Sequence, residues 1–523
     1  MFVGIDLGTS GVKLLLMGNE GSVIATHTEE YPCSFPKPGW SEQEPEVWYE
    51  KSLSGLKKLL KKGNADIEDI DGIGTGGQMH GLVMLDKDDN VIRPAILWND
   101  GRSTEEVAYL NETIGNDKLT EYTGNIAFAG FTAPKLLWVR KNEPENFARI
   151  AKIMLPKDYL VYRLTGAFST DYSDASGMLF LDVKNKKWSP EMLSICGITE
   201  EMLPKLYESY EVVGELKKEV IPTDKKIIVV AGAGDNAAAA VGTGAVGPGR
   251  CNISIGTSGT IFITNDKFVV DEKNSLHAFA HADGGFHLMG CMLSAASCNK
   301  WFMDEILQDK DYAALQAKIC DIKKASETDP ESTEIGDENS GEINDEISGE
   351  INSRNYDKLG NNRIYFLPYL MGERSPHNDP DIRAMFYGMS LDTKREDMYQ
   401  AVLEGVAYGL RDSLEVARDM GLEITSATIC GGGARSPLWL KILANVLKLR
   451  LDIPVTEEGP SMGGAMLAAV GCGTFSDIIA AGNIVRNVEY SVEPDPVLME
   501  RYDAEYGKFR RFYPALKNTG IAE

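Results

Sequence analysis

Phe2-Val-Gly-Ile-Asp-Leu-Gly-Thr-Ser-Gly-Val-Lys13 opens the chain with an apolar run that carries a single acid, Asp6. The run breaks at the turn Gly8-Thr-Ser-Gly11 and then resumes, which predicts a β-hairpin with a glycine-rich tip. Glycines at such a tip allow positive φ and a close approach of backbone N–H groups to an anion. The hydroxyl groups of Thr9 and Ser10 add donors, and Asp6 could hold a cation that bridges phosphates.

The same tetrapeptide returns in Ile253-Ser-Ile-Gly-Thr-Ser-Gly-Thr260. In this alignment Ser254 replaces Asp6, while Thr257 and Ser258 repeat the hydroxyl pair. Each copy opens about half of the chain. The repeat therefore predicts two similar lobes that serve one phosphate chain, of which only the first carries a metal-binding acid.

Length and charge limit the possible classes of protein. A chain of 523 residues exceeds the roughly 250–300 residues at which one core stops growing, so at least two domains are expected. The net charge of −25 argues against nucleic-acid and anionic-membrane partners. An anionic ligand must then be attracted by a divalent ion, backbone donors and helix N-termini.

Targeting signals and cysteine patterns predict a cytoplasmic protein. The N-terminus lacks a basic segment followed by an apolar run and a cleavage site, and no stretch approaches the roughly 20 apolar residues of a membrane span. The 8 cysteines are scattered and form no C-x-x-C pair, so we expect reduced thiols.

Strands alternate with helices along the chain, which predicts an α/β fold. Ile227–Ala231 is the clearest buried strand, and Asp397–Met420 is a long amphipathic helix. Gly244–Gly249 is expected to form a hinge, which gives two domains, 1–245 and 246–523. Residues 325–355 have no basic residue before Arg354 and repeat Ser-Gly-Glu-Ile-Asn, so we predict an acidic low-complexity surface insert.

Glycine-rich loops are the first candidates for chemistry. The chain has no G-x-x-x-x-G-K-[ST], and it has no kinase-type H-R-D or D-F-G. Instead, Gly431-Gly-Gly433 follows the predicted strand that ends at Cys430 and joins the two hairpins as a third glycine loop. We interpret these loops as a cradle for phosphates and a nucleoside, against the alternative of ordinary turns.

Asp235 and His80 are the candidate reactive and binding side chains. Asp235 lies between a glycine turn and an alanine-rich helix start, where an acid is most often an N-cap. The flanking Gly232 and Gly234 leave room for a substrate, so Asp235 could also accept a proton from an attacking hydroxyl. His80 and its neighbour Gln78 sit in a loop between glycines, and ligand contact is left open against a plain structural role.

Other patterns favour structural interpretations. Three histidines are spaced as in some metal sites but lack cysteine or acid ligands at suitable spacing apart from one aspartate. The Asp171–Asp174 pair and the 98–102 segment are expected to be turn and packing features. The three histidines are His277, His281 and His287.

Taken together, the motifs resemble the FGGY family of carbohydrate kinases in the actin-like ATPase superfamily. The similarity covers nearly the full length apart from the insert. The motifs are Gly4-Ile-Asp-Leu-Gly-Thr-Ser10, Gln78-Met-His-Gly81, Trp98-Asn-Asp100, Gly232-Ala-Gly-Asp-Asn236, Ser254-Ile-Gly-Thr-Ser258 and Gly431-Gly-Gly-Ala-Arg-Ser436.

The resemblance implies two ribonuclease H-like lobes and ATP-dependent phosphorylation of a sugar, with D-xylulose and its C5 hydroxyl as the expected acceptor. Asp235 would be the general base and Asp6 would orient Mg²⁺. The residues expected to bind sugar are Gln78, Met79, His80, Trp98, Asp235 and Asn236. The residues expected to bind ATP are Thr9, Ser10, Thr257, Ser258, Gly432, Gly433 and Asn445.

Two alternatives stay open at this stage. One is a kinase for another ketose or polyol, such as ribulose, glycerol or gluconate, in which Gln78-Met-His80 would differ. The other is a nucleotide-gated binding protein of the actin or chaperone type, which would not need a base such as Asp235. The expected partners are a small sugar and ATP, without nucleic acid or membrane, and a homodimer is one option for the assembly.

Overall fold

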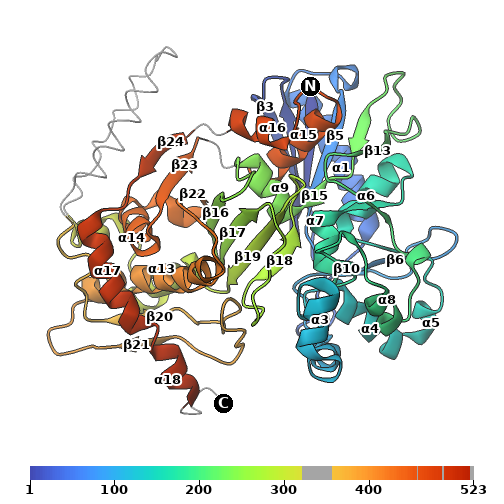
Figure 1. Cartoon of the computed structure of the whole chain (residues 1–523). Coiled ribbons are helices and arrows are strands. Elements are labelled where there is room, and N and C mark those ends of the chain that lie inside the picture. The colour runs from blue at the N-terminus through green and yellow to red at the C-terminus, as the bar shows by residue number, and fades with distance from the viewer. Residues whose placement is uncertain (321–355, 456–457, 486–487, 519–523) are drawn as a thin grey trace. The chain divides into compact units, whose positions relative to one another are not determined.

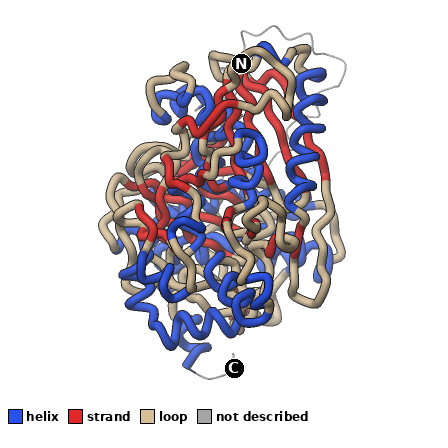
Figure 2. The backbone as a smooth tube through the Cα atoms, turned by 90° about the vertical axis from the view of Figure 1, so that its right-hand side faces the viewer, coloured by secondary structure: helices blue, strands red, loops and turns tan. Residues whose placement is uncertain are grey.

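The computed structural model describes residues 1–320, 356–455, 458–485 and 488–518. The chain folds into two compact units. Unit 1 comprises Met1–Pro248, Thr264–His287 and Glu458–Arg486, and unit 2 comprises Gly249–Ile263, Leu288–Glu457 and Asn487–Glu523. Helices, strands and loops alternate along the backbone tube (Figure 2), which confirms the predicted α/β class.

Unit 1 contains a mixed sheet in the order β13-β14-β5-β1-β2-β3, and β15 also pairs with β5 (Figure 1). β1 pairs antiparallel with β2 and parallel with β5. β14 and β15 both run parallel to β5. The strands are β1 (Phe2–Leu7), β2 (Gly11–Met17), β3 (Val23–Glu30), β5 (Gly72–Gly77), β13 (Val212–Glu215), β14 (Ile228–Val230) and β15 (Ala233–Gly234).

The strand β5 is built largely of glycine because a helix from the end of the chain lies directly on it. A Cβ added to Gly74 would lie 2.0 Å from the carbonyl oxygen of Gly464 in α15 (Pro460–Gly471). Only residues without side chains allow the two backbones this close. α15 thus belongs to unit 1, although it lies far along the sequence.

The other helices of unit 1 cover the sheet or form the peripheral layer after it. The long α1 carries Trp48, Leu56 and Leu59 into the core, as its apolar spacing predicts. These helices are α1 (Pro45–Lys62), α2 (Thr104–Ala108), α3 (Asn116–Thr123), α4 (Thr132–Asn142), α5 (Pro144–Phe147), α6 (Pro156–Thr165), α7 (Tyr172–Ala175), α8 (Pro190–Cys196), α9 (Asp235–Gly242) and α16 (Ile478–Val485).

Unit 2 repeats the central pattern of unit 1. Six neighbouring strands of its sheet follow the order β19-β17-β16-β22-β23-β24, where β16 pairs antiparallel with β17 and parallel with β22. The strands are β16 (Cys251–Ile255), β17 (Gly259–Asn265), β19 (Phe286–Met292), β22 (Ser426–Cys430), β23 (Arg450–Pro454) and β24 (Val488–Val492). The helices are α10 (Ala296–Trp301), α11 (Tyr312–Ala317), α13 (Arg395–Asp419), α14 (Pro437–Leu447), α17 (Pro496–Phe509) and α18 (Phe512–Asn518).

Both predicted hairpins form, but one reason expected from the sequence, positive φ at the glycines of the tips, does not apply. The glycines of the tips, such as Gly8 and Gly11, do not adopt positive φ. Space explains Gly11 instead, since a Cβ there would lie 2.8 Å from the carbonyl oxygen of Glu29. The predicted acidic insert at 325–355 lies outside the described residues.

The domain boundary predicted at 245/246 lies close to the first break between the compact units, after Pro248. The units themselves are interleaved, because two later segments pack with unit 1. The two contiguous domains, 1–245 and 246–523, stay a prediction. Within the described residues, no helix is both long and apolar enough to cross a membrane.

Candidate active site

In unit 1, three parallel strands end side by side and bring Asp6 and Asp235 to one edge of the sheet. Asp6 in β1 is in register with Gly76 of β5, and Gly76 is in register with Ala233 of β15. Asp235 follows β15 directly. Ligands commonly bind at the carboxyl ends of strands in such sheets. The two acids therefore lie where chemistry is expected.

Asp235 is the first residue of α9, and the cap position belongs to Gly234. The N-cap alternative considered from sequence is thus wrong by one position. One carboxylate oxygen of Asp235 accepts the backbone N–H of Asn236 at 2.7 Å. Burial raises the pKa of Asp235 to about 6, although this hydrogen bond opposes the rise. A carboxyl group with such a pKa can accept a proton near neutral pH.

Asp6 is surrounded by charge of both signs. Burial raises its pKa to about 7, with further increases from Asp235 and Glu458, whereas Lys13 lowers it. Lys13 faces Asp6 across the hairpin and bonds Glu458 at 2.6 Å. Lys13 and Glu458 were missed from sequence; the cross-strand position of Lys13 was a signal that could have identified it.

The donor set around Asp6 fits a magnesium ion that arrives bound to phosphates. Mg²⁺ prefers oxygen ligands and usually binds through one or two carboxylates, substrate phosphates and water. A cation beside Asp6 would offset the burial of its charge and the repulsion from Asp235 and Glu458, which together raise the pKa of this carboxyl group. In the described part of the chain, no group of three or more His, Cys, Asp or Glu side chains could hold a metal ion by itself.

The tip of the first hairpin is tied into a hydrogen-bond network. Thr9 Oγ1 accepts from Trp98 Nε1 at 2.9 Å and donates to Gln78 Oε1 at 3.2 Å. Gln43 Nε2 donates to the carbonyl oxygen of Thr9 at 2.6 Å. The structure thus brings Thr9 together with two predicted sugar-binding residues, while the side chain of Ser10 is exposed.

Met79 and His80 form a wall beside the start of α9. The Asn236 side-chain amide lies 3.8 Å from Met79 Sδ, and Met79 leaves no room for a Cβ on Gly234. His80 adopts φ 70°, which is uncommon for a non-glycine residue. Its Nδ1 lies 2.9 Å from the carbonyl oxygen of Gly177. Met79 therefore adjoins Gly234 and Asn236, the residues on either side of the candidate base, and His80 follows it in the chain.

Two residues that were not predicted hold the unusual backbone of His80. The carbonyl oxygen of His80 accepts from Thr132 Oγ1 at 3.0 Å and from Lys135 Nζ at 2.9 Å. Lys135 is fully buried, and burial lowers its pKa to about 7. The sequence gives little signal for this role, because Lys135 is one of several polar residues in α4.

In unit 2, the tip of the second hairpin exposes Thr257 and Ser258. The start of α10 supports this tip from behind. Ala295 N–H and Ser297 Oγ donate to the carbonyl oxygen of Thr257 at 2.9 and 2.7 Å, and Ala296 N–H donates to Gly256. The hydroxyl groups are left to face solvent or a ligand.

The third glycine loop lies against the base of this hairpin. Gly431 has φ 90°, and a Cβ there would lie 2.7 Å from the carbonyl oxygen of Ile255. A Cβ on Gly433 would lie 2.4 Å from the Ile255 side chain, whereas Gly432 has open space around it. Unit 2 therefore brings together four of the predicted ATP-binding residues: Thr257, Ser258, Gly432 and Gly433.

Asn445, the other residue predicted to bind ATP in this unit, is fully buried in α14. Its Nδ2 donates to Lys441 O at 2.7 Å and its Oδ1 accepts from Asp495 N at 2.7 Å. The amide nitrogen thus bonds within α14, and the amide oxygen bonds the start of α17. Its contact with adenosine stays a prediction.

Comparison with known proteins assigns this arrangement to a family. Residues 1–242 match the N-terminal domain of the FGGY family of carbohydrate kinases, and residues 251–472 match the C-terminal domain of the same family. The chain belongs to the FGGY family of carbohydrate kinases. It is accordingly a sugar kinase that uses ATP as the phosphoryl donor, as its motifs predict.

Individual relatives are similar over almost the whole chain. The xylulose kinase of Escherichia coli (strain K12) is 38% identical over 520 residues, which cover 99% of each chain. The xylulose kinase of Bacillus subtilis (strain 168) is 35% identical over 524 residues, covering 99% of this chain and 98% of the relative. A crystal structure of a xyloylose kinase from Brucella ovis has a TM-score of 0.87 and 38% identity, with 99% of both chains covered.

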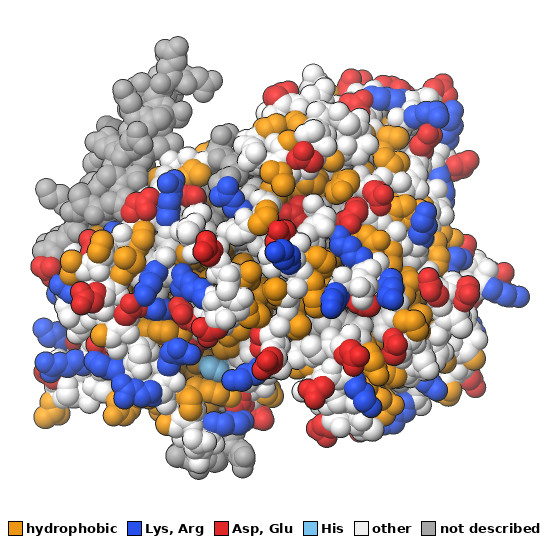
Figure 3. All heavy atoms as spheres, viewed as in Figure 1, with side chains coloured by type: hydrophobic (Ala, Val, Ile, Leu, Met, Phe, Trp, Pro, Cys, Tyr) orange, Lys and Arg blue, Asp and Glu red, His pale blue; other side chains and the backbone are white. Residues whose placement is uncertain are grey.

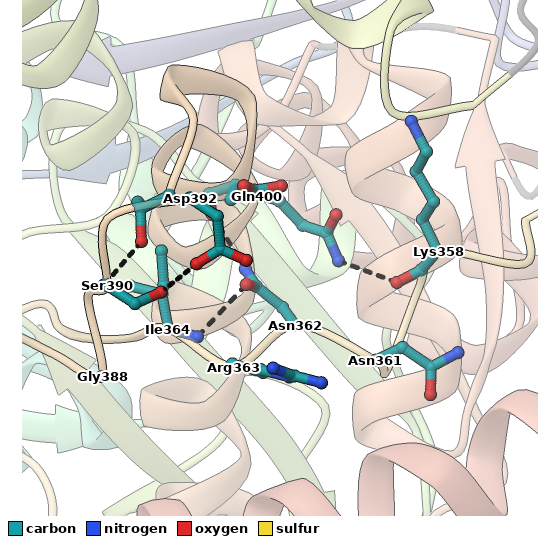
Figure 4. A pocket seen from close by; sticks show the side chains of 11 residues that line it. Lys358, Asn361, Asn362, Arg363, Ile364, Gly388, Ser390, Asp392 and Gln400 are labelled. Atoms are coloured by element: carbon teal, nitrogen blue, oxygen red, sulfur yellow. Dashed lines mark hydrogen bonds between the residues drawn. The ribbon is translucent and has the colours of Figure 1, made fainter.

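A separate pocket in unit 2 of this FGGY kinase contains none of the predicted site residues (Figure 4). It has a volume of about 380 Å³ and lies between the loops that precede α13. Its polar groups bond one another: Ser390 Oγ donates to Asp392, and Gln400 Nε2 donates to the carbonyl oxygen of Lys358. We assign it no ligand.

The three histidines considered as a metal site pack against aromatic rings in unit 1. His277 stacks on Phe279 with centroids 5.5 Å apart, and His281 meets His287 edge to face. Burial lowers the pKa of His281 and of His287. Buried neutral imidazoles packed in this way agree with the structural role expected for them.

Proposed function

We propose that this FGGY kinase transfers the γ-phosphoryl group of ATP to the C5 hydroxyl of D-xylulose. The substrate class is supported by relatives named xylulose kinase that are similar over their full length. The general-base mechanism in this proposal rests on the position of Asp235. It starts α9 next to the Met79–His80 wall and has a pKa near 6.

In the proposed reaction, Asp235 accepts the proton of the sugar hydroxyl as that oxygen attacks the γ-phosphorus. The new O–P bond forms as the bond to the bridging oxygen breaks, and ADP leaves with that oxygen. Positioning and electrostatic stabilisation supply most of the catalysis in such transfers. The phenylalanine-packed ring of His80, together with Gln78, Trp98 and Asn236, would orient the sugar.

Asp6 would hold a Mg²⁺ ion, which neutralises charge on the transferring phosphates when bound. Thr257 and Ser258 would donate hydrogen bonds to the terminal phosphates from their exposed hairpin tip. Gly432 and Gly433 would leave room for the nucleoside. Thr9 and Ser10 would complete the phosphate side from the first hairpin, where Thr9 also contacts Trp98.

The test is ADP release with Mg-ATP and a panel of acceptors: D-xylulose, D-ribulose, L-ribulose, glycerol, gluconate and no sugar. We expect a large stimulation by D-xylulose and its loss in Asp235→Asn, since a general base contributes roughly 10²–10⁴-fold. His80→Ala should weaken D-xylulose use selectively. Stimulation by another acceptor in place of D-xylulose would reject D-xylulose as the substrate. ATP turnover that does not change with any sugar would reject the kinase mechanism.

A further inference from the structure

Behind the candidate base, unit 1 contains a buried polar chain centred on Asp171. Lys157 Nζ from α6 lies 2.9 Å from Asp171 Oδ1. The other oxygen, Oδ2, accepts from the hydroxyl groups of Ser173 and Ser209 and from the backbone N–H of Ser173 at 2.9 Å. All four residues are at most 1% exposed. Solvent therefore does not compete for these bonds.

The two serines connect Asp171 to the segment that leads into the base. Ser173 Oγ lies 3.1 Å from the backbone nitrogen of Gly234, and the carbonyl oxygen of Ser209 lies 2.9 Å from the backbone nitrogen of Gly232. A backbone N–H can only donate, so the Ser173 oxygen accepts there. Its single proton is then free to point at Asp171.

This chain ends next to the reacting group. Gly234 is the cap of α9, and Asp235 is the first residue of the helix. Asp171 therefore determines the direction of the Ser173 hydroxyl, and this hydroxyl anchors the peptide immediately before Asp235.

We propose that Asp171, held by Lys157, is a positioning residue for Asp235, acting through Ser173 on the backbone of Gly234 and through Ser209 on that of Gly232. The inference rests on the proposed role of Asp235 as the base. It goes further by naming the groups that hold this base in place.

The charges of the cluster agree with this role. Lys157 also lies 2.7 Å from Asp158 and 3.7 Å from Asp174. Burial raises the pKa of Asp158 and of Asp174, and the charge of Lys157 opposes this rise. Burial opposes the charge on Lys157, but the neighbouring carboxyl groups raise its pKa above the ordinary value. Lys157 is thus kept as a cation for Asp171.

The test compares two serines that each make buried hydrogen bonds. Ser173→Ala removes the acceptor for Gly234 N–H, and we expect kcat with D-xylulose to fall roughly 10–100-fold, the cost of a small misplacement of a reacting group. The KM for Mg-ATP should stay within about twofold, because the nucleotide-binding groups are untouched. Ser189→Ala is the control: Ser189 is also buried and caps α8 through Met192 N–H.

The melting temperature separates positioning from general loss of stability. We expect Ser173→Ala and Ser189→Ala to melt at similar temperatures, with kcat reduced only in Ser173→Ala. If Ser173→Ala does not fold, Ser209→Ala serves instead, because it removes one donor to Asp171 and keeps the backbone bond to Gly232.

Three results would overturn the inference. The first is an unchanged kcat in folded Ser173→Ala or Ser209→Ala together with an inactive Asp235→Asn. This result would reject the positioning role and leave the base assignment intact. Equal losses of kcat in the test and control variants would reduce the cluster to a structural role. A fully active Asp235→Asn would reject the base itself, and the positioning role with it.

Discussion

The two Gly-Thr-Ser-Gly hairpins share a sequence and a place in their sheets but present different chemistry. β1–β2 in unit 1 and β16–β17 in unit 2 each lie beside a parallel strand, β5 or β22. In the first hairpin Thr9 is engaged by Trp98 and Gln78, whereas Thr257 of the second is exposed. The tetrapeptide is the same in both hairpins, so the surrounding residues distinguish their roles.

The loops also differ in length between their last paired residues. In the first hairpin Leu7 pairs with Val12, and in the second Ile255 pairs with Gly259. The second tip is therefore tighter, and α10 holds its carbonyl groups from behind. This comparison indicates that the first hairpin positions a carboxylate and sugar-side groups, while the second offers hydroxyl donors to phosphate.

The largest expected effect on kcat concerns Asp6 and its counterpart Ser254, because this is the position at which β1 and β16 differ in charge. Asp6→Ala should lower kcat by roughly 10²–10³-fold, because it removes the carboxylate proposed for Mg²⁺. Ser254→Ala, the matched change in the second hairpin, should change kcat by less than about threefold, since Ser254 carries no charge. Steady-state ADP release at several Mg²⁺ concentrations measures kcat for both variants. Equal losses of kcat would contradict the proposed difference between the two hairpins.

The next effect concerns the glycines that follow the parallel strands. Gly431 has φ 90° and touches the Ile255 backbone, whereas Gly77 at the end of β5 has ordinary φ. Gly431→Ala should cost roughly 1–3 kcal/mol of unfolding free energy, the usual cost of a strained backbone position. Gly432→Ala is the control, because open space surrounds that position. Thermal unfolding of both variants measures the difference, and equal melting temperatures would contradict the close contact.

A smaller effect should separate the hydroxyl groups of the two tips. Thr257→Val should raise the KM for Mg-ATP about tenfold, because a hydrogen bond to a charged phosphate contributes roughly 1.5–3 kcal/mol. Thr9→Val should instead change mainly the KM for the sugar, since the Thr9 hydroxyl group bonds Trp98 and Gln78 in addition to its proposed place on the phosphate side. Initial rates with each substrate varied in turn measure the two effects. The comparison fails if both variants change the same KM.

Much of this arrangement could be predicted because it depends on local patterns. The hairpins and the strand before Asp235 follow from apolar runs interrupted by glycine, and the long helix predicted at 397–420 follows from its apolar spacing. The candidate roles of Asp6 and Asp235 came from the residue patterns, the resemblance to the FGGY family added the substrate and the other site residues, and all these roles stay predictions. Acidic and basic side chains intermix over the visible face of the molecule (Figure 3).

The missed features depend on contacts between residues far apart in the chain. Lys135 supports His80 from 55 positions away, and Gly464 meets Gly74 across most of the sequence. Lys157 resembles an ordinary surface cation until its three buried carboxyl neighbours are seen. Sequence periodicity reports which face of an element is buried, but it does not report which distant residue lies there.

The last expected effect, similar in size to the change in KM, is a pH dependence that originates in Asp235 of unit 1. Burial raises the pKa of Asp235 from 3.8 to about 6, and a general base acts in its deprotonated form. As the pH falls through about 6 the active fraction falls, so kcat/KM for the sugar should be about tenfold lower at pH 5 than on its plateau above pH 7.

Ser258→Ala in the second hairpin provides the matched control for this profile. It should lower the plateau but leave the midpoint near pH 6, since a hydroxyl group in unit 2 carries no charge to shift a carboxyl pKa. The measurement is kcat/KM from about pH 5 to about pH 8 for both proteins, with ADP detected directly. A midpoint near the ordinary carboxyl value would mean that solvent reaches Asp235, and the burial that makes it an effective base near neutral pH would then be lost.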